Sequence, residues 1–371
     1  MPGQQGFGGD DGGHLGQHAP SQLPRSDCQA TALVVVQLQS SRADLGVQNA
    51  VLLSQVVKAR LSGANCGSAW SQTFGFDVFG NINKFGSQSF TPSYNASTNR
   101  INGGGYSASY DGNGDMTNDG MSPGEITYTW DANGNPRTIT RGSTSVTVIY
   151  DALGRAVENQ SGGSYTQILY GPNGDKLALM NGGTLVKAFV GLPGGAQAVY
   201  SSSGLAYYRH SDWLGSSRLA SNPDQTLHFS GAYAPYGEDY AKTGTTDLSF
   251  TGQNQDTISG LHDFMFRRYN PVHGRWMSPD PAGLGAVDLS NPQSLNRYAY
   301  VLNNPTNWID PLGLLPMCWV VGPPEDRREE CIDAPPPPFE PHEPTKQGGN
   351  GPKAAITVMA TPPGAPITSS S

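Results

Sequence analysis

Polar and apolar residues alternate along many short stretches of this chain, and tight-turn residues separate the stretches. In "EITYTW" (125–130), "TSVTVIY" (144–150) and "YTQILY" (165–170), β-branched and aromatic residues recur at about every second position, which is the period of a half-buried strand. The chain also contains 48 glycines and 29 prolines but only 14% charged residues. Short strands joined by tight turns are typical of such a composition. The sequence therefore predicts an all-β fold.

The stretches belong to a repeat that begins with an aromatic residue, an aspartate and, three residues later, a glycine. The leading aromatics are Tyr110, Trp130, Tyr150 and Tyr170, so each step is twenty residues, which accommodates two strands and their turns. The unit at Tyr170 is a weaker copy, with Gly171 in place of the aspartate. A hairpin alone is only marginally stable, so we expect consecutive hairpins to add side by side into one curled antiparallel sheet. We expect each Asp to cap its turn and each aromatic to stack along the sheet. The alternative is an exposed aromatic ladder that binds carbohydrate.

Charge and composition exclude several classes of protein. The formal net charge of -8 and the pI near 5.3 argue against nucleic-acid binding, which needs clustered Lys and Arg. No apolar run reaches the length of about 18 residues that a membrane span requires, and residues 1–20 lack the features of a secretory signal peptide. The four cysteines have no metal-ligand spacing and do not indicate a disulfide framework. We therefore predict no metal and no other cofactor.

The same pentapeptide pattern occurs twice, as "DPAGL" (280–284) and "DPLGL" (310–314). One interpretation is two ordinary turns, because Asp-Pro starts turns and Gly ends them. The other is that Asp280 and Asp310 meet in space. Two carboxylates close enough to share a proton have pKa values driven apart, which provides one base and one acid for peptide hydrolysis. A peptide bond just beyond Asp310 would then lie within reach, as an intramolecular substrate.

The repeat units "WDANGN" and "YDALGR" resemble those of Rhs and YD-repeat proteins. The strings "HSDWLGSSRLAS", "YAPYGE", "GRWMSPDP" and "NRYAYVLNNPTNWIDPLGL" are similar to the RHS repeat-associated core domain. The resemblance implies a sheet wound as a spiral shell, and a core domain that cuts the chain after Leu314 to release a variable C-terminal polypeptide. It also implies that two aspartates and an upstream arginine are needed, and these match Asp280, Asp310 and Arg267, with Arg268 and Arg275 as alternates.

These patterns divide the chain into four parts. Residues 1–67 remain unassigned, although "LGVQNAVLLSQVVKARLSG" (45–63) has the apolar spacing of a short helix. Residues 68–206 are predicted to form the YD-repeat sheet and residues 207–314 the core domain. Apart from "MCWVV", residues 315–371 are Pro-rich and Gly-rich, so we expect them to be mostly disordered. The hairpins are too few to close a roomy shell, so we expect an open sheet and a C-terminal fragment of a longer family member.

Three functional hypotheses follow. The first is a self-processing bacterial shell protein, secreted or at the cell surface, whose substrate is its own tail and whose partners are upstream shell-forming or secretion-system proteins. The second is a non-enzymatic scaffold or surface protein that binds carbohydrate. The third is a delivered toxin or effector whose activity lies in the tail.

Overall fold

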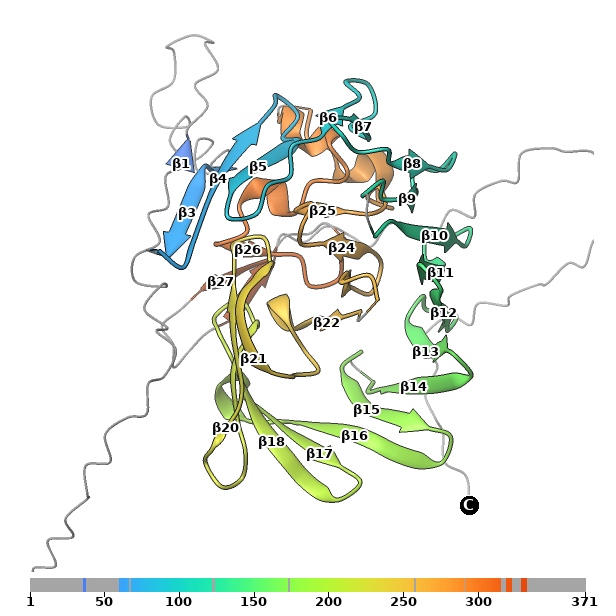
Figure 1. Ribbon diagram of the computed structural model, residues 1–371, viewed down its shortest axis with the longest axis vertical. Coiled ribbons are helices and arrows are strands. Elements are labelled where there is room, and N and C mark those ends of the chain that lie inside the picture. Colours follow the sequence, from blue (N-terminus) through green and yellow to red (C-terminus); the bar gives the residue numbers. More distant parts are fainter. Residues whose placement is uncertain are drawn as a thin grey trace, which may run out of the picture. The chain divides into compact units, whose positions relative to one another are not determined.

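The computed structural model describes residues 36–37, 60–66, 68–121, 124–172, 174–256, 258–289, 291–314, 318–321 and 328–331. Within these residues the secondary structure consists of β-strands and short 3-10 helices (Figure 1). None of the helices in this part of the chain has the length and apolar character needed to cross a bilayer.

Fourteen strands form one sheet in which each strand pairs antiparallel with its neighbour in sequence (Figure 1). The order of strands is therefore the order of the chain, from β8 at one edge to β21 at the other. The prediction of consecutive hairpins in an antiparallel sheet is confirmed. The strands are β8 (Ser109–Tyr110), β9 (Met116–Asn118), β10 (Ile126–Trp130), β11 (Pro136–Arg141), β12 (Thr144–Tyr150), β13 (Ala156–Ser161), β14 (Ser164–Tyr170), β15 (Lys176–Asn181), β16 (Thr184–Gly191), β17 (Gln197–Ser201), β18 (Gly204–Ser211), β19 (Ser217–Ser221), β20 (Leu227–Tyr233) and β21 (Asp239–Gly244).

The aspartate of each YD unit closes its turn, as the sequence predicts. Asp151 Oδ1 accepts hydrogen bonds from the backbone N–H groups of Leu153 and Arg155, each at 2.9 Å. The backbone N–H of Gly154 donates to the Asp151 carbonyl at 3.1 Å, and Gly154 has a φ of 76°, a conformation that favours glycine. Asp111 and Asp131 cap their turns in the same way.

The aromatic residues of three units, Trp130, Tyr150 and Tyr170, each connect their strand to the preceding hairpin. The hydroxyl groups of Tyr150 and Tyr170 donate to the carbonyls of Pro136 (3.0 Å) and Ala156 (2.9 Å), each fourteen residues upstream. Trp130 Nε1 donates to the Met116 carbonyl, also fourteen residues upstream, at 2.7 Å. These rings are half-buried, so their polar atoms bond within the sheet. The geometry favours a structural role for them over an exposed carbohydrate-binding ladder.

The predicted core domain begins inside β18 and supplies the sheet up to Gly244, and residues that follow β21 pack directly on the sheet. Leu261 and Met277 share one buried cluster with Ile126, Tyr128 and Ile139 of β10 and β11. A second cluster, formed by Phe250, Phe264, Tyr269, Trp276, Tyr300 and Val301, lies within the core domain and positions the candidate site described below.

The remaining elements form smaller sheets and single turns of 3-10 helix. The small sheets contain β1 (Val36–Gln37) with β2 (Arg60–Leu61); β3 (Gly63–Cys66), β4 (Trp70–Phe76) and β5 (Ile82–Gly86); β6 (Ser93–Tyr94) with β7 (Ile101–Gly103); β22 (Asn254–Gln255), β23 (His262–Asp263), β24 (Arg268–Asn270) and β25 (Arg275–Trp276); and β26 (Trp308–Ile309), β27 (Cys318–Val321) and β28 (Arg328–Cys331). The 3-10 helices are η2 (Pro193–Gly195), η3 (Phe250–Gly252), η4 (Gly283–Ala286), η5 (Pro292–Leu295) and η6 (Val301–Asn303).

The N-terminal predictions need correction at the described positions. Residues 60–61 and 63–66 form β2 and β3, so a helix over 45–63 is wrong at its C-terminal end; residues 45–59 lie outside the described part. The proposed boundary after residue 67 falls inside a hairpin, because β3 pairs with β4. Cys66 is disulfide-bonded, which the cysteine count did not predict. Local apolar spacing was overridden here by pairing with a neighbouring strand.

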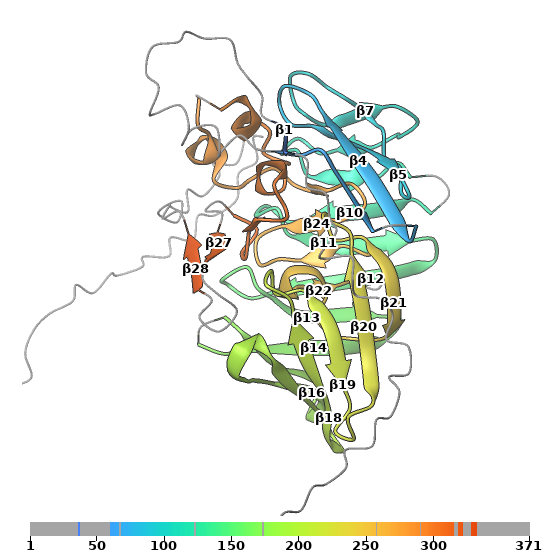
Figure 2. The same cartoon turned by 90° about the vertical axis from the view of Figure 1, so that its left-hand side faces the viewer.

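The beginning of the tail also carries strand structure. β27 pairs antiparallel with β26 of the core domain, and β28 pairs with β27 (Figure 2). The sequence set "MCWVV" apart from the Pro-rich tail but did not predict a strand at residues 328–331. Those residues are polar and lack strand periodicity, so the pairing supplied by β27 decides their conformation. The rest of the predicted disorder, at residues 322–327 and 332–371, lies outside the described residues.

Candidate active site

The two aspartates of the repeated pentapeptide contact the same arginine nitrogen. Arg267 Nη2 is 3.0 Å from Asp280 Oδ2 and 3.1 Å from Asp310 Oδ2. All three side chains are buried, with exposed fractions of 3% for Arg267, 4% for Asp280 and 3% for Asp310. The structure thus brings Arg267, Asp280 and Asp310 together, as the sequence analysis expected. Along the chain, 43 positions separate Arg267 from Asp310.

The loop that follows β26 is folded around the Asp310 carboxylate. Asp310 Oδ1 accepts hydrogen bonds from the backbone N–H groups of Gly313 and Leu314, both at 2.8 Å. Gly313 has a φ of 77°, and a Cβ there would lie 3.2 Å from the backbone nitrogen of Arg267. Glycine is therefore required both by the conformation and by the close approach of the arginine segment. Leu315, on the far side of the predicted cut, lies outside the described residues.

Asp280 also caps a turn of its own. Its Oδ1 accepts the backbone N–H of Ala282 at 2.9 Å, and its carbonyl accepts that of Gly283 at 3.1 Å. Both aspartates thus start turns, as the two-turn interpretation expects, and both also contact Arg267. Each carboxylate uses one oxygen for its turn and directs the other to Arg267.

Arg267 is held on every side of its guanidinium. Its Nε donates to the Gly313 carbonyl at 2.5 Å, and its Nη1 donates to the Arg297 carbonyl at 3.2 Å. The guanidinium carbon lies 4.2 Å from the centre of the Trp276 ring, in a cation–π arrangement. The Arg297 carbonyl also accepts the backbone N–H of Asp280 at 3.0 Å. The arginine therefore connects the two turns and fixes their separation.

Burial changes the protonation of Asp310. Desolvation disfavours the charged carboxylate and raises the pKa of Asp310 to about 7, because the opposing attraction of Arg267 is the smaller effect. The nearby charge of Asp280 raises this pKa further, whereas the N–H groups of Gly313 and Leu314 lower it. Near pH 7 Asp310 is therefore partly protonated, so it can donate or accept a proton, which suits proton transfer.

The two alternate arginines lie elsewhere. Arg268 pairs with Asp263 at 3.1 Å and donates to the Tyr150 hydroxyl at 3.0 Å. Arg275 donates to Asn81 Oδ1 at 2.7 Å and lies over the ring of Tyr94. Both connect the core domain to the hairpins. Of the three candidates, Arg267 is the one that contacts both aspartates.

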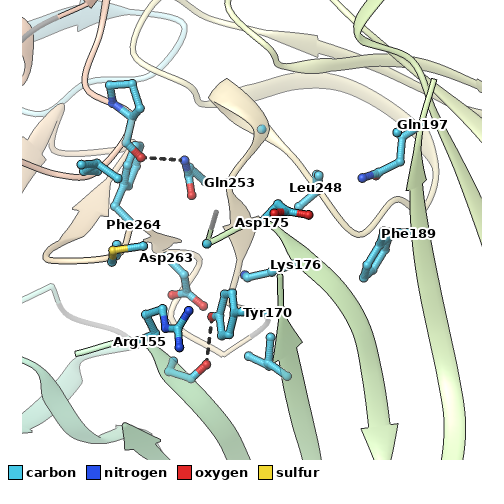
Figure 3. Close-up of a pocket in the computed structure, with 18 of the residues that line it drawn as sticks. Arg155, Tyr170, Asp175, Lys176, Phe189, Gln197, Leu248, Gln253, Asp263 and Phe264 are labelled. Atoms are coloured by element: carbon cyan, nitrogen blue, oxygen red, sulfur yellow. Dashed lines mark hydrogen bonds between the residues drawn. The ribbon is translucent and has the colours of Figure 1, made fainter. Parts of the chain in front are cut away.

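A cavity of about 510 Å³ lies against the same loop (Figure 3). Pro311 and Leu312 form part of its wall, and Gln253 holds the loop there by donating to the Pro311 carbonyl at 3.3 Å. Lys176 and Asp263 line the cavity as well, and burial lowers the pKa of Lys176 to about 8 and raises that of Asp263. The cavity therefore borders the loop between Asp310 and Gly313.

Several contributors to this site were not predicted. Trp276 follows Arg275 in "GRW", where the sequence analysis considered the arginine and not the ring beside it. Gln253 and the Arg297 carbonyl carry no local signal, because their role depends on contacts between segments distant in sequence. Trp276, an aromatic residue next to the candidate Arg275, is the one of these contributors that the sequence could have indicated.

A sheet of consecutive YD hairpins with a packed core domain defines the class of YD-shell proteins. The family model described as Teneurin YD-shell matches residues 52–306, and the chain belongs to this family. The prediction of an Rhs/YD-repeat protein is confirmed.

Individual relatives match over shorter stretches. Toxin subunit YenC2 of Yersinia entomophaga is 37% identical over 95 residues, which are 24% of this chain and 9% of that protein. Toxin protein Tse5 of Pseudomonas aeruginosa is 34% identical over 137 residues, 35% of this chain and 10% of that protein. This chain thus spans about a tenth of the length of these relatives.

Solved structures show the same fold. A Photorhabdus luminescens Tc holotoxin pore matches with a TM-score of 0.53 at 22% identity, over 67% of this chain and 13% of the matched chain. A complex of TcdB2 with TccC3 gives a TM-score of 0.52 at 21% identity, over 66% of this chain and 14% of the matched chain. At these identities the likeness establishes the fold alone.

Proposed function

We propose that this chain is a self-processing part of a toxin-delivery shell, secreted or presented at the cell surface, which cuts itself once between Leu314 and Leu315. The observation that carries the proposal is the shared contact of Asp280 and Asp310 with Arg267, beside the loop that contains Leu314. The toxin names of the curated relatives support the delivery role, and the partner subunits in the solved Tc complexes suggest that shell-forming proteins are its partners.

The proposed chemistry uses Asp280 as the base and Asp310 as the acid. Asp280, as its carboxylate, removes a proton from a water molecule, whose oxygen adds to the carbonyl carbon of Leu314. Asp310, protonated over part of the neutral range, donates its proton to the nitrogen of Leu315. The C–N bond then breaks, which leaves a carboxyl group on Leu314 and an amine on Leu315. Arg267 stabilises negative charge throughout.

Substrate and catalyst are one chain in this scheme, so a single turnover suffices and no substrate-binding cleft is needed. The loop is held by hydrogen bonds from Gly313 and Leu314 to Asp310 and by the bond from the Phe266 N–H to the Leu312 carbonyl at 3.0 Å. Such positioning replaces the entropy cost of bringing a separate substrate to the site.

The two other hypotheses lack a specific supporting observation. The YD aromatics bond within the sheet, which does not favour a carbohydrate-binding scaffold. An effector activity in the tail falls largely on residues outside the described part.

The test compares two Asp→Asn changes during synthesis and purification. Asp280→Asn is expected to slow the cut by about 100-fold or more, because it removes one member of an acid–base pair. Asp151→Asn is the matched control, since the Asp151 carboxylate caps a turn through bonds to Leu153 and Arg155 and not to Arg267. The amount of whole and cut chain is followed on denaturing gels over time. Equal rates in the two variants would refute the proposal.

A further inference from the structure

One lysine outside the candidate active site is buried completely against a glutamate. The Lys84 side chain has no exposed surface, and its Nζ lies 2.5 Å from Oε1 of Glu238, whose side chain is 4% exposed. Lys84 belongs to β5, whereas Glu238 lies in the turn between β20 and β21, 154 positions further along the chain. The amine also donates to the Pro271 carbonyl at 2.6 Å. The proposed self-cleavage uses none of these groups.

From this arrangement we propose that Lys84 and Glu238 condense into an amide, so that an isopeptide bond joins β5 to the turn between β20 and β21. The inference goes beyond the proposed function, because it assigns a second, bond-forming reaction to groups that the cut does not use. Both residues precede Leu314, so the bond would be the same in the whole chain and in the cut chain.

The surroundings of the lysine favour its neutral, nucleophilic form. The ring of Tyr236 is fully buried and its centre lies 4.8 Å from Lys84 Nζ, and Phe74 packs edge-on against that ring, with 5.0 Å between the ring centres. The backbone at Gly274 closes another side, because a Cβ there would lie 3.0 Å from Lys84 Cε. Burial lowers the pKa of Lys84, against the attraction of Glu238. A desolvated lysine is a more available nucleophile than a solvated one.

The carboxyl group of Glu238 is placed as the electrophile. Its Oε1 faces Lys84, and Gln72 Nε2 lies 3.5 Å from the same oxygen, so a donor is present for the negative charge that develops there. Its Oε2 is buried and has no hydrogen-bond partner among the residues that the structure describes. A buried polar atom without a partner is unfavourable, and the condensation removes this atom as water.

The reaction balances without a co-reactant. One ammonium proton of Lys84 passes to the carboxylate of Glu238, which gives an amine and a carboxylic acid and removes both charges from apolar surroundings. The Nζ atom then forms a bond to Cδ, a second proton moves from the nitrogen to the departing hydroxyl group, and the bond from Cδ to Oε2 breaks. Water leaves, and nothing is oxidised or reduced. The fixed contact between the two groups replaces the entropy cost of an encounter.

Peptide mapping of the purified wild-type chain tests the inference. The chain is reduced, because Cys66 is disulfide-bonded, and is then denatured, digested with trypsin and analysed by mass spectrometry. The expected product is peptide 61–100, uncut after Lys84, joined to peptide 219–242. Its mass should be lower than the summed peptide masses by one water molecule. Mapping is needed as well as intact mass, since an Asp-Gly step such as that at Asp111 can also lose water.

The chain offers a matched control within the same digest. Lys187 Nζ lies 2.7 Å from Asp247 Oδ1, but the lysine side chain is 34% exposed, so water solvates the charged amine and this pair is expected to stay unlinked. A second control is Lys84→Arg, which keeps the positive charge and lacks the primary amine. The joined peptide should be absent from that variant. If the variant does not fold, the wild-type map still decides the inference.

Three results would each overturn the inference. The first is a wild-type digest with free peptides 61–84 and 219–242 and no joined product. The second is a link between Lys84 and Gln72 with loss of ammonia, and the third is an equal yield of a link between Lys187 and Asp247. A chain that never cuts itself would refute the proposed function and leave the expected map unchanged, so the two failures are distinguishable.

Discussion

Replacement of Arg267 by methionine tests whether this arginine is what allows two carboxylates to be buried together. The change keeps much of the aliphatic volume and removes the guanidinium that lies 3.0 Å from Asp280 and 3.1 Å from Asp310. It also removes the donors to the carbonyls of Gly313 and Arg297. Two buried acids then remain without a counter-charge.

The expected loss of stability is large and depends on pH. Removal of one partner from a buried ion pair typically costs about 3–5 kcal/mol, and we expect this loss in the free energy of unfolding near pH 8. The folded-state pKa of Asp310, about 7, already exceeds its ordinary value of 3.8, so falling pH through 7 protonates the folded form before the unfolded chain and stabilises it. Without Arg267 that pKa rises further, so the deficit of the variant should shrink as the pH is lowered to 5.5.

Urea unfolding of wild type and variant at pH 8 and pH 5.5, followed by tryptophan fluorescence, measures both quantities. The fraction of cut chain is determined in each sample, so that the free energy of unfolding is compared between preparations cut to the same extent. Arg137→Met is the control, because Arg137 is exposed in β11, and its effect should be within about 0.5 kcal/mol at both pH values. A loss below about 1 kcal/mol for Arg267→Met, or a loss equal at the two pH values, would refute the reasoning.

Three further predictions concern the turn, the hairpin link and one buried histidine. Asp151→Ala should lower the free energy of unfolding by about 1–2 kcal/mol, since it leaves the N–H groups of its turn without their acceptor; urea unfolding checks this, and no measurable loss would contradict the capping role. Tyr170→Phe should cost about 1 kcal/mol by removing the bond to the Ala156 carbonyl, and a variant as stable as wild type in the same assay would show that the bond contributes nothing. His262 is buried against Tyr269, and burial lowers the pKa of His262 from 6.5 to about 3, so its contribution to stability is lost as pH falls below 6.5. Between pH 7 and pH 5 the free energy of unfolding should therefore fall by about 2 kcal/mol less in His262→Phe than in wild type. Identical pH profiles would exclude this role of the histidine.

The regular part of the fold was predictable because its signals are local and repeated. A twenty-residue period, alternating strands, and a turn whose Asp and Gly are both visible in "YDALGR" determine a hairpin, and neighbouring hairpins complete one another's edges. The bonds from Trp130, Tyr150 and Tyr170 to carbonyls fourteen residues upstream were not predictable, because they depend on the register between hairpins.

The site was predictable in part and for a different reason. The repeated Asp-Pro-x-Gly-Leu pattern indicated which acids to compare, and the family resemblance, not spacing, pointed to Arg267. Spacing alone left Arg268 and Arg275 open, since three arginines within nine positions differ only in which way the folded chain directs them. Arg268 is directed to Asp263 and Arg275 to Asn81, which long-range packing decides.

The strands at the two ends were missed because their conformation comes from a partner strand. Residues 328–331 read "REEC", with no alternation, and are extended because β27 lies beside them. Residues 60–63 lie at the end of an apolar pattern of helical period, and Arg60, Leu61 and Gly63 are extended because they pair with β1 and β4. Single-sequence patterns contain no record of such pairing.

Sequencing of the N-terminus of the short fragment, with intact-mass analysis of the same preparation, tests the central claim most directly. The account predicts a fragment that begins at Leu315, a large fragment that ends at Leu314, and the loss of both in the Asp310→Asn chain. A purified chain that keeps its full mass, or a cut at any other bond that persists in Asp310→Asn, would contradict it.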